Sequence, residues 1–354
     1  MTENLEHQHE DVYGKSFALY GKADMLEFIE PFRIRFERNG LDAGAIFFGK
    51  NCLDAGCGNG RGSLFMMMHG AGSVHYLDVA KTNIESTKRN LDEFGFPSER
   101  GRLGSIEHLP FEDGSFDFVW CNGVIMHTAN PDGCLKEIAR VLRTGGRAWL
   151  YVYGAGGLYW WMIRQFRRML AGVATETVMA SLQLARYPVR YVAEYIDDWK
   201  VPYLRTYTRD DLGARLDELG FENTTPLPFG LDYDTSHRRN TNPADAIWTG
   251  DGDLRYLLVK VQPSSGDTRP LKSSEYGSDV AFAPELEARF GNAFAELKDL
   301  LDGRPFMTVM ACAHIQCDFR EVLSRQGGLD LRAVEEIVER VLGLVRSLCP
   351  EPAL

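Results

Sequence analysis

A glycine-rich loop between a short apolar run and a helix-forming stretch most strongly constrains the fold of this chain. The segment NCLDAGCGNGRG, residues 51–62, alternates Gly56, Gly58 and Gly60 with other residues. Glycines that follow a strand and open a helix let backbone amides approach a ligand closely. The spacing is not the G-x-G-x-x-G of dinucleotide-binding folds, and no Gly-Lys-Ser/Thr follows, which excludes a P-loop. A ligand-binding loop and a purely structural turn both remain open.

Strand and helix patterns alternate after this loop, which predicts an α/β fold with a doubly wound, mostly parallel sheet. Pro31 is expected to break the first helical region, and Gly145–Gly146 to stop the helix at 130–146. Thr208 is expected to cap the helix at 207–221. The predicted strands are 50–55, 73–80, 101–106, 116–124, 147–153 and 251–261.

The same patterns divide the chain into segments. We expect N-terminal helices that cover the ligand site, a catalytic or binding domain with a helical lid insertion, a polar linker, and a helical C-terminal extension. In that order these segments are 1–48, 49–261 with the lid at 154–205, 262–274, and 275–354.

Composition narrows the classes of function. Apolar residues make up 44% of 354, which is enough for a large core. The net charge of −11 argues against a nucleic-acid partner. Seven cysteines without a dense framework favour a reducing cytoplasm. We expect neither a signal peptide nor a membrane span, because the N-terminus is polar and no apolar run reaches spanning length.

Further motifs follow the loop in a fixed order. Asp78 ends a predicted strand about 20 residues after the loop, where a carboxylate can accept both hydroxyls of a ribose. The remaining elements are Leu109-Pro110-Phe111, Phe116-Asp117, His127, Arg140-Val141-Leu142 and Gly145-Gly146.

With these motifs, residues 51–153 resemble the class I S-adenosylmethionine-dependent methyltransferases, a Rossmann-like α/β family. The subgroup that includes the ubiquinone and menaquinone-biosynthesis methyltransferases is the most similar. The resemblance covers about a hundred residues strongly and 206–261 weakly, and it does not extend to the last 90 residues.

The resemblance implies S-adenosylmethionine as cofactor and a role for each matching residue. The glycine loop lies under the methionine part, the acid after the second strand binds the ribose, and two residues flank the adenine. Two departures are Ser105, where an aspartate is common, and Thr144, where a proline is usual. The implied cofactor contacts are Asp54, Gly56, Gly58, Asp78, Val79, Ser105, Ile106, Asn122 by its backbone, and Tyr20 from the N-terminal segment.

Methyl transfer is an in-line displacement in which the protein mainly aligns the reactants. A general base is needed where the nucleophile is protonated at neutral pH, and His127 is the candidate. A structural role for His127, as a hydrogen-bonding residue in its loop, is the alternative. Cys57 and Cys121 are expected to pack rather than react.

The acceptor is expected to lie under the lid, whose helix combines aromatic residues with three arginines. It can wall a pocket for a hydrophobic or aromatic substrate, rest on a membrane surface, or simply pack on the sheet. Arg238 or Arg239 is a candidate for an acidic substrate group. The aromatic and apolar residues of the lid helix are Tyr159, Trp160, Trp161, Met162, Ile163, Phe166 and Met169, and the second loop adds Phe229, Tyr233 and His237.

No metal is expected. The segment ACAHIQCDF holds Cys312, His314 and Cys317, but no second pair completes four zinc ligands. At the N-terminus, Tyr13 and Tyr20 are expected either to close over the cofactor or to pack on the sheet.

The leading hypothesis is a cytoplasmic methyltransferase that acts on an oxygen or nitrogen of a small hydrophobic or aromatic metabolite. Its alternatives are carbon methylation of a quinone or isoprenoid-type substrate and a non-catalytic S-adenosylmethionine-binding protein. No nucleic-acid partner is expected, and peripheral membrane contact is not favoured. The C-terminal helices are expected to form a homodimer contact or to cover the active site.

Overall fold

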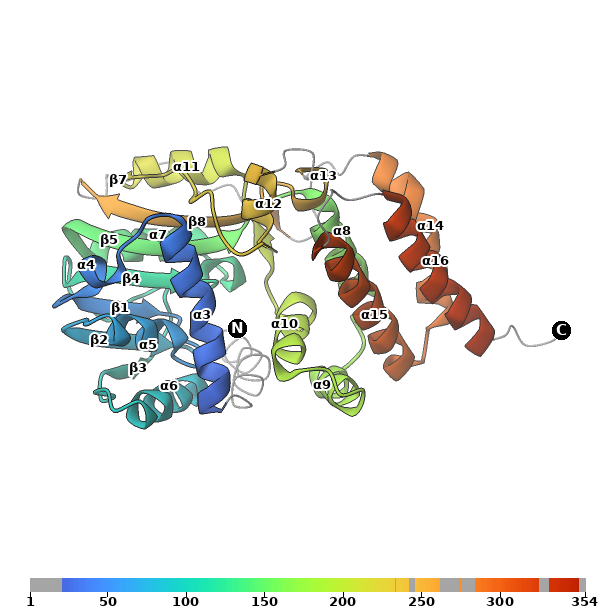
Figure 1. Cartoon of the computed structure of the whole chain (residues 1–354), viewed down its shortest axis with the longest axis horizontal. Helices are drawn as coiled ribbons and strands as arrows, with labels where there is room; N and C mark the ends of the chain where they lie inside the picture. The colour runs from blue at the N-terminus through green and yellow to red at the C-terminus, as the bar shows by residue number, and fades with distance from the viewer. Residues whose placement is uncertain are drawn as a thin grey trace.

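The computed structural model describes residues 21–232, 234–241, 246–261, 274–275, 284–324 and 331–349 (Figure 1). A seven-stranded sheet has the order β3-β2-β1-β4-β5-β8-β7, and β8 alone runs antiparallel to its neighbours on both sides. This confirms the predicted α/β fold with a mostly parallel sheet. The strands are β1 (Asn51–Ala55), β2 (Ser73–Asp78), β3 (Gly101–Leu103), β4 (Phe116–Asn122), β5 (Leu142–Tyr153), β7 (Phe221–Glu222) and β8 (Asp253–Lys260), with β6 (Arg205–Thr206) and β9 (Ser274–Glu275) in a separate pair.

Helices cover both faces of the sheet, and a second group of helices lies beside its edge (Figure 1). The helices next to the sheet are α3 (Lys22–Arg38), α4 (Ala43–Phe47), α5 (Arg61–Met68), α6 (Lys81–Glu93), the short 3-10 helix η2 (Ile125–His127), α7 (Pro131–Val141) and α11 (Arg209–Glu218). The remaining helices are α8 (Gly157–Met169), α9 (Thr175–Leu184), α10 (Val189–Lys200), α12 (Thr235–Thr241), α13 (Ala246–Thr249), α14 (Pro284–Leu300), α15 (Pro305–Ser324) and α16 (Leu331–Leu348).

Side chains of the central strands alternate between two buried faces. Trp120 of β4 packs with Phe32 of α3 and Phe65 of α5. Its neighbour Cys121 lies in the opposite cluster with Leu135 of α7. Successive residues of a strand point to opposite faces, and a parallel sheet needs both faces covered. This two-sided burial explains the nearly continuous apolar strands of the sequence.

The expected break at Pro31 is wrong. Pro31 lies inside α3, whose buried residues Met25, Ile29, Phe32 and Phe36 follow one face of the helix. A proline removes one backbone hydrogen bond and usually kinks a helix. Here Pro31 lies off the buried stripe, so packing of that stripe on the sheet holds the helix together on both sides of it.

The expected stop at Gly145–Gly146 is also wrong. α7 ends at Val141, and Leu142 already pairs with Phe116 as part of β5. The pairing register shifts between Phe116 and Phe118, so the glycines form an irregularity within the strand pair. Thr208, by contrast, caps α11 as predicted, because its side chain accepts a hydrogen bond from the Asp211 amide.

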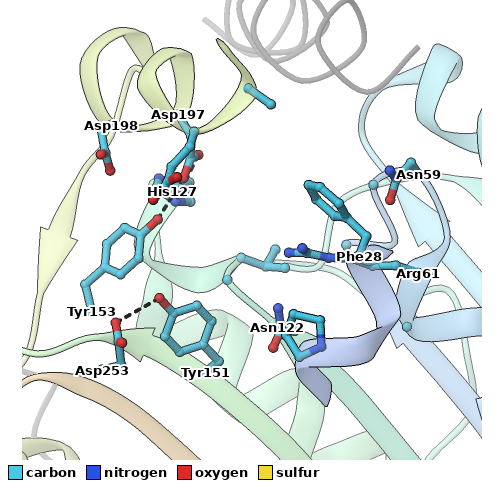
Figure 2. Close-up of a pocket in the computed structure, with 18 of the residues that line it drawn as sticks. Phe28, Asn59, Arg61, Asn122, His127, Tyr151, Tyr153, Asp197, Asp198 and Asp253 are labelled. Carbon is cyan, nitrogen blue, oxygen red and sulfur yellow. Dashed lines mark hydrogen bonds and ion pairs between the residues drawn. The ribbon is translucent and has the colours of Figure 1, made fainter. Parts of the chain in front are cut away.

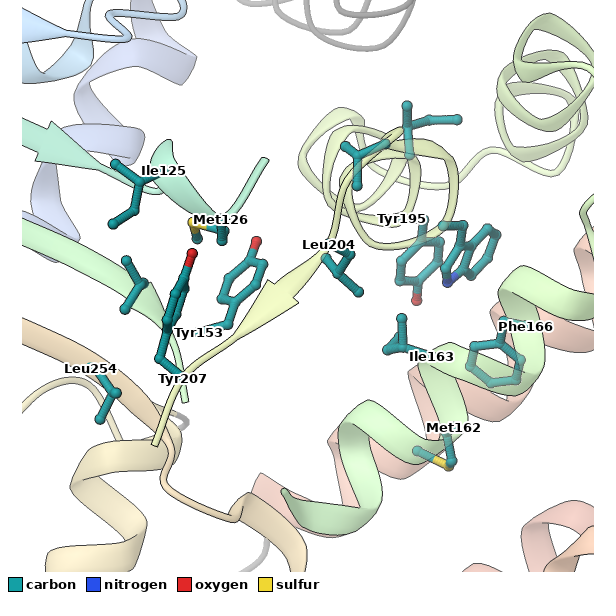
Figure 3. Packing of buried hydrophobic residues seen from close by; sticks show 14 of the residues in the cluster. Ile125, Met126, Tyr153, Met162, Ile163, Phe166, Tyr195, Leu204, Tyr207 and Leu254 are labelled. Atoms are coloured by element: carbon teal, nitrogen blue, oxygen red, sulfur yellow. The ribbon is translucent and has the colours of Figure 1, made fainter. Parts of the chain in front are cut away.

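The helices that directly follow β5 (α8 to α10) pack against the C-terminal helices (α14 to α16), and we call these helices together the cap. α9 contacts α15, and α8 contacts both α14 and α10. Their apolar residues join the cluster on one face of the sheet in a continuous core, part of which is shown in Figure 3. None of the described helices is long and apolar enough to cross a membrane.

Candidate active site

A cavity of about 1180 Å³ opens at the carboxyl edge of the parallel strands, between α3 and the cap (Figure 2). Its walls come from the loops after β1, β2 and β4, from α3 and α10, and from α15. The strand order reverses between β1 and β4, and such a switch point is where doubly wound sheets bind ligands. The cavity therefore lies where the fold favours a ligand.

The glycine loop is bent towards the cavity by left-handed backbone conformations. Gly56 has φ +81°, and a Cβ there would lie 2.5 Å from a methyl group of Val124. Gly60, which precedes α5, has φ +85°. The amides of Gly56 and Cys57 both donate to the Leu77 carbonyl, at 2.8 and 3.0 Å, and fasten the loop to β2. Only glycine combines these conformations with this close approach.

Asp78 ends β2 and lines the cavity with its carboxylate held in place. It accepts hydrogen bonds from the amides of Gly58 and Ala80, both at 2.9 Å, and from Asn83 Nδ2 at 3.1 Å. These hydrogen bonds fix the carboxylate at the end of β2, on the wall of the cavity.

Two buried amides beside Asp78 provide a test of whether a polar ligand fits. Asn83 and Asn59 both line the cavity. Asn83 Oδ1 and Asn59 Nδ2 are buried and have no hydrogen-bond partner among the described residues. Buried polar groups normally have partners, so these atoms indicate a ligand that brings a donor and an acceptor. A nucleoside with ribose hydroxyls meets that requirement.

Asp54, the last polar residue of β1, is fully buried beneath the loop. Its Oδ2 accepts a hydrogen bond from Ser63 Oγ at 2.7 Å. Burial raises the pKa of Asp54 to about 6, although the Ser63 hydrogen bond opposes this change. A cationic group of a ligand would favour the charged carboxylate, because an opposite charge offsets part of the cost of burial.

Ser105, Ile106, Val79 and Asn122 also line the cavity. The Ser105 hydroxyl accepts from the Glu107 amide at 3.1 Å, so it also stabilises its own turn. Asn122 Oδ1 accepts from Trp149 Nε1 at 3.0 Å, which holds the Asn122 side chain against β5. Tyr20 and Tyr13 lie outside the described residues.

His127 lies in η2, at the end of the cavity nearest the cap. Its Nδ1 donates to the Tyr203 carbonyl at 2.9 Å, which leaves Nε2 as the lone-pair nitrogen of the neutral ring. Asp197 Oδ1 of α10 lies 3.7 Å from Nε2. Burial lowers the pKa of His127 below its usual value, although Asp197 opposes this shift. The neutral, proton-accepting form is therefore favoured.

Aromatic side chains surround this histidine. The ring of Tyr153 meets His127 edge-on, with centroids 5.6 Å apart, and lies 4.5 Å from the ring of Trp160. The Tyr153 hydroxyl donates to Asp197 Oδ2 at 2.7 Å, and Tyr151 donates to Asp253 at 3.0 Å (Figure 2). The end of the cavity nearest the cap thus combines flat apolar walls with polar groups at fixed positions.

Comparison with known proteins agrees with this geometry. The family model described as "Methyltransferase domain" matches residues 53–150. Residues 53–150 form a class I S-adenosylmethionine-dependent methyltransferase domain. The match begins in β1 and ends in β5, so it includes the glycine loop, Asp78 and His127.

Relatives of the methyltransferase domain act on different acceptors. A sarcosine/dimethylglycine N-methyltransferase of Aphanothece halophytica is 33% identical over 99 residues, which cover 28% of this chain and 36% of that protein. A ubiquinone biosynthesis O-methyltransferase of Escherichia fergusonii is 28% identical over 168 residues, which cover 46% of this chain and 68% of that protein. The match spans about a third of the length of the first four curated relatives.

A solved structure, the YcgJ protein of Bacillus subtilis, aligns over 64% of this chain and 99% of its own with 18% identity and a TM-score of 0.41.

Residues outside the methyltransferase domain complete the end of the cavity that lies beneath the cap. Asp197 and Tyr203 come from the region after α9, and Arg320 comes from α15. The local sequence around them carries no motif, so sequence reasoning missed them.

The lid helix α8 contributes less to the cavity than expected. Tyr159 and Trp160 line it. Trp161 instead packs against Phe290 and Phe294 of α14. Met162, Ile163 and Phe166 are buried in the same core, and Met169 packs against it. Ordinary packing therefore explains most of the aromatic and apolar face of α8.

The second loop does not reach the cavity with the residues singled out from the sequence. Phe229, His237, Arg238 and Arg239 are absent from its walls, and Tyr233 lies outside the described residues. Arg239 instead pairs with Asp251 at 2.8 Å.

Arg255 and Asp234 line the cavity in their place. Arg35 of α3 binds both oxygens of Asp234, at 2.7 and 2.8 Å, and Arg255 lies 3.2 Å from Asp253. Burial alone would raise the pKa of Asp234, but the charges of Arg255 and Arg35 outweigh burial and hold this pKa below its usual value. The network fastens α3 to the loop before β8.

The cysteines of α15 lie in two different surroundings. Within the described part of the chain, no group of three or more histidine, cysteine, aspartate or glutamate residues could hold a metal ion. Cys312 is buried in the core of the cap, whereas Cys317 lies at the wall of the cavity. Burial raises the pKa of both thiols, which keeps them protonated.

Proposed function

We propose that this protein transfers a methyl group from S-adenosylmethionine to an oxygen or nitrogen atom of a small hydrophobic or aromatic molecule. One observation carries the proposal: a single cavity is lined by Asp54 and Asp78 at the glycine loop and by His127 and Asp197 beneath the cap. A cofactor and an acceptor can therefore lie next to each other in one continuous cavity, as a displacement between them requires.

The cofactor end is suited to hold S-adenosylmethionine through residues of the methyltransferase domain. Asp78 and Asn83 would bind the ribose, Ser105 and Ile106 would flank the adenine, and Asp54 would face the ammonium group. When bound, the cofactor supplies a methyl group on a sulfonium sulfur, which is a good leaving group.

At the acceptor end, the chain aligns the nucleophile and takes up its proton. His127 Nε2 is the proton-accepting atom, since the Tyr203 carbonyl holds the proton on Nδ1. Trp160, Tyr153 and Tyr159 supply the apolar walls that a hydrophobic or aromatic acceptor needs.

The C-terminal helices cover this acceptor end. Support comes from Arg320 and Glu321 of α15, which line the cavity together with residues of α10. The cap therefore limits access of water and selects the acceptor by shape.

The first test is binding of S-adenosylmethionine by calorimetry to the wild type, Asp78→Ala and the exposed-carboxylate control Asp210→Ala. We expect wild-type and control binding to agree, and Asp78→Ala to bind about tenfold or more weakly, because charge-assisted hydrogen bonds to the ribose are lost. The absence of wild-type binding, or equal binding by Asp78→Ala, would overturn the assignment. Binding without formation of S-adenosylhomocysteine across acceptor libraries would instead favour a non-catalytic binding protein.

A further inference from the structure

We propose that Asp198 and Glu194 of α10, together with Arg320 of α15, form a proton-sensitive latch that holds these two helices together beside the cavity. The latch is closed when Asp198 carries a proton, and it loosens when that proton is lost. All three residues line the cavity, so the latch controls how its cap end is closed. This inference goes beyond the proposed function, because the latch belongs to the cap and needs neither a cofactor nor an acceptor.

The first argument is that two carboxylates share one cation. Glu194 and Asp198 lie four residues apart on α10, so their side chains are neighbours on one side of the helix. Arg320 Nη1 donates to Glu194 Oε2 at 2.6 Å, and Arg320 Nη2 lies 3.9 Å from Asp198 Oδ2. Two neighbouring carboxylates repel each other when both are charged, which raises the pKa of one of them. One carboxyl group of the latch therefore retains a proton more readily than a free carboxyl group does.

The second argument identifies Asp198 as the group that retains the proton. Its side chain is 5% exposed, whereas that of Glu194 is 46% exposed. Asp198 Oδ2 accepts hydrogen bonds from two neutral donors, the Tyr159 hydroxyl at 2.6 Å and Gln316 Nε2 at 2.7 Å. A protonated carboxyl group keeps an acceptor oxygen for such donors, while burial disfavours only its charged form. Burial raises the pKa of Asp198 to about 7, Glu194 adds to this rise, and Arg320 opposes it.

The remaining groups around Asp198 do not change this assignment. Among the described residues, Arg320 is the cation that pairs with the Asp198 carboxylate, and Glu194 binds the same guanidinium more closely. Asp197 raises the pKa of Asp198 further. Arg167 donates to the Asp198 backbone carbonyl at 3.2 Å. The titratable and charged groups that surround Asp198 are Tyr159 and Arg167 of α8, Glu194 and Asp197 of α10, and Arg320 of α15, with Arg190 and Glu321 on the same wall of the cavity.

The third argument is that Asp198 connects three helices of the cap. Its hydrogen-bond donors Tyr159 and Gln316 come from α8 and α15, and Gln316 Oε1 also accepts from Trp199 of α10 at 2.7 Å. A neutral Asp198 fits this buried contact. A charged Asp198 adds a second negative charge one helical turn from Glu194, against a single guanidinium. Loss of the proton therefore weakens the contact between α10 and α15 and loosens the wall of the cavity that α10 carries (Figure 2).

The direction of the pH dependence follows from the two pKa values of Asp198. The pKa of an aspartate in an open, solvated state is about 3.9. The pKa of Asp198 in the closed latch is about 7. The closed state thus binds the proton more tightly, so its stabilisation is complete below about pH 3.9 and is lost progressively as the pH rises to about 7. Between pH 5.5 and 8.0 the equilibrium constant for opening should rise about 30-fold.

The test is hydrogen exchange of peptides from α10 and α15 at pH 5.5 and 8.0, corrected for the intrinsic exchange rate, with α7 as the reference helix. We expect the protection of α10 in the wild type to fall about 30-fold over this interval. In Asp198→Asn the protection should stay within about threefold, because asparagine keeps an acceptor oxygen for Tyr159 and Gln316 but does not titrate. The protection of α7 should change little in both proteins.

Glu194→Gln tests the shared cation at a half-exposed position. It leaves one carboxylate for Arg320, so the midpoint of the change, followed from pH 5 to 8.5, should move down by about one pH unit or more. The latch is wrong if wild type and Asp198→Asn show the same pH dependence, or if Glu194→Gln leaves the midpoint in place. An equal loss of protection in α7 would also contradict it, because the proton would then stabilise the whole fold. These measurements use the protein without S-adenosylmethionine, so failure of the latch is distinct from failure of the cofactor to bind.

Discussion

The residues of the site divide into those with local partners and those with distant ones. Asp54 is the second-last residue of β1 and Asp78 is the last residue of β2, both beside the glycine loop, so strand order and one motif were enough to predict their place in the cavity. His127 is different, because its partner Tyr203 lies 76 positions away. Contacts between distant segments depend on how the cap packs, and no local pattern encodes them. Asp197 could therefore not be predicted.

At this scale, the role of His127 is tested by His127→Gln. Glutamine can still donate to the Tyr203 carbonyl, but it cannot accept a proton at neutral pH. We expect turnover to fall by about 100-fold or more, which is typical for loss of a general base. Affinity for S-adenosylmethionine, measured by calorimetry, should stay within about twofold, since the variant residue lies at the acceptor end.

The pH dependence gives the matching control. Burial lowers the pKa of His127 below its usual value of 6.5, so the neutral base persists to lower pH than in a free histidine. The wild-type kcat/KM should therefore be constant through neutral pH and fall only below pH 6.5, as the imidazole becomes protonated. Turnover of His127→Gln close to the wild type, with the same acid limb, would assign His127 a structural role instead.

At the scale of elements, the sequence predicted the order of strands and helices from β1 to β5 well. Apolar strands buried on both faces and amphipathic helices leave strong local patterns. The errors fell at Pro31 and at Gly145–Gly146, where tertiary contacts override the local preference. α3 continues past Pro31 because its apolar stripe is anchored on both sides, and β5 begins early because Leu142 pairs with Phe116.

The glycine loop gives the test at this scale, through Gly56→Ala. The new Cβ would meet Val124 at 2.5 Å, in a left-handed conformation that alanine disfavours. We expect a loss of about 2–4 kcal/mol in the free energy of unfolding, from backbone strain plus overpacking. Chemical denaturation measures this loss. Cofactor affinity should fall as well, because the contact with Val124 would displace the glycine loop on which the cofactor is proposed to lie.

Gly95→Ala is the matched control for backbone strain alone. Gly95 has φ +78°, but a Cβ there meets no atom within 4 Å. Its cost should be about 1–2 kcal/mol, with cofactor affinity retained. Equal destabilisation by the two substitutions would show that the contact with Val124 does not constrain the loop.

At the scale of the whole molecule, the active site is assembled from parts that are remote in the chain. The methyltransferase domain supplies the cofactor end, while α10 and α15 supply the cap end. Gln316 of α15 connects these cap helices: its Oε1 accepts from Trp199 at 2.7 Å, and its Nε2 donates to Asp198 at 2.7 Å. Trp199 and Asp198 stand beside Asp197 on α10, so α15 stabilises the helix that places Asp197 in the wall of the cavity.

This arrangement predicts that the C-terminal helices unfold together with the sheet. Gln316→Leu should lower the free energy of unfolding by about 2–4 kcal/mol, because the Trp199 indole and the Asp198 carboxylate each lose a buried partner. The control His314→Leu changes an exposed residue of the same helix and should cost about 0.5 kcal/mol or less. Because one core cluster runs from the sheet through α8 to α16, circular dichroism and tryptophan fluorescence should report a single transition in all three proteins. A separate early transition in the wild type would show instead that the cap is an independent unit, and its helices would then be unable to hold Asp197 rigidly against His127.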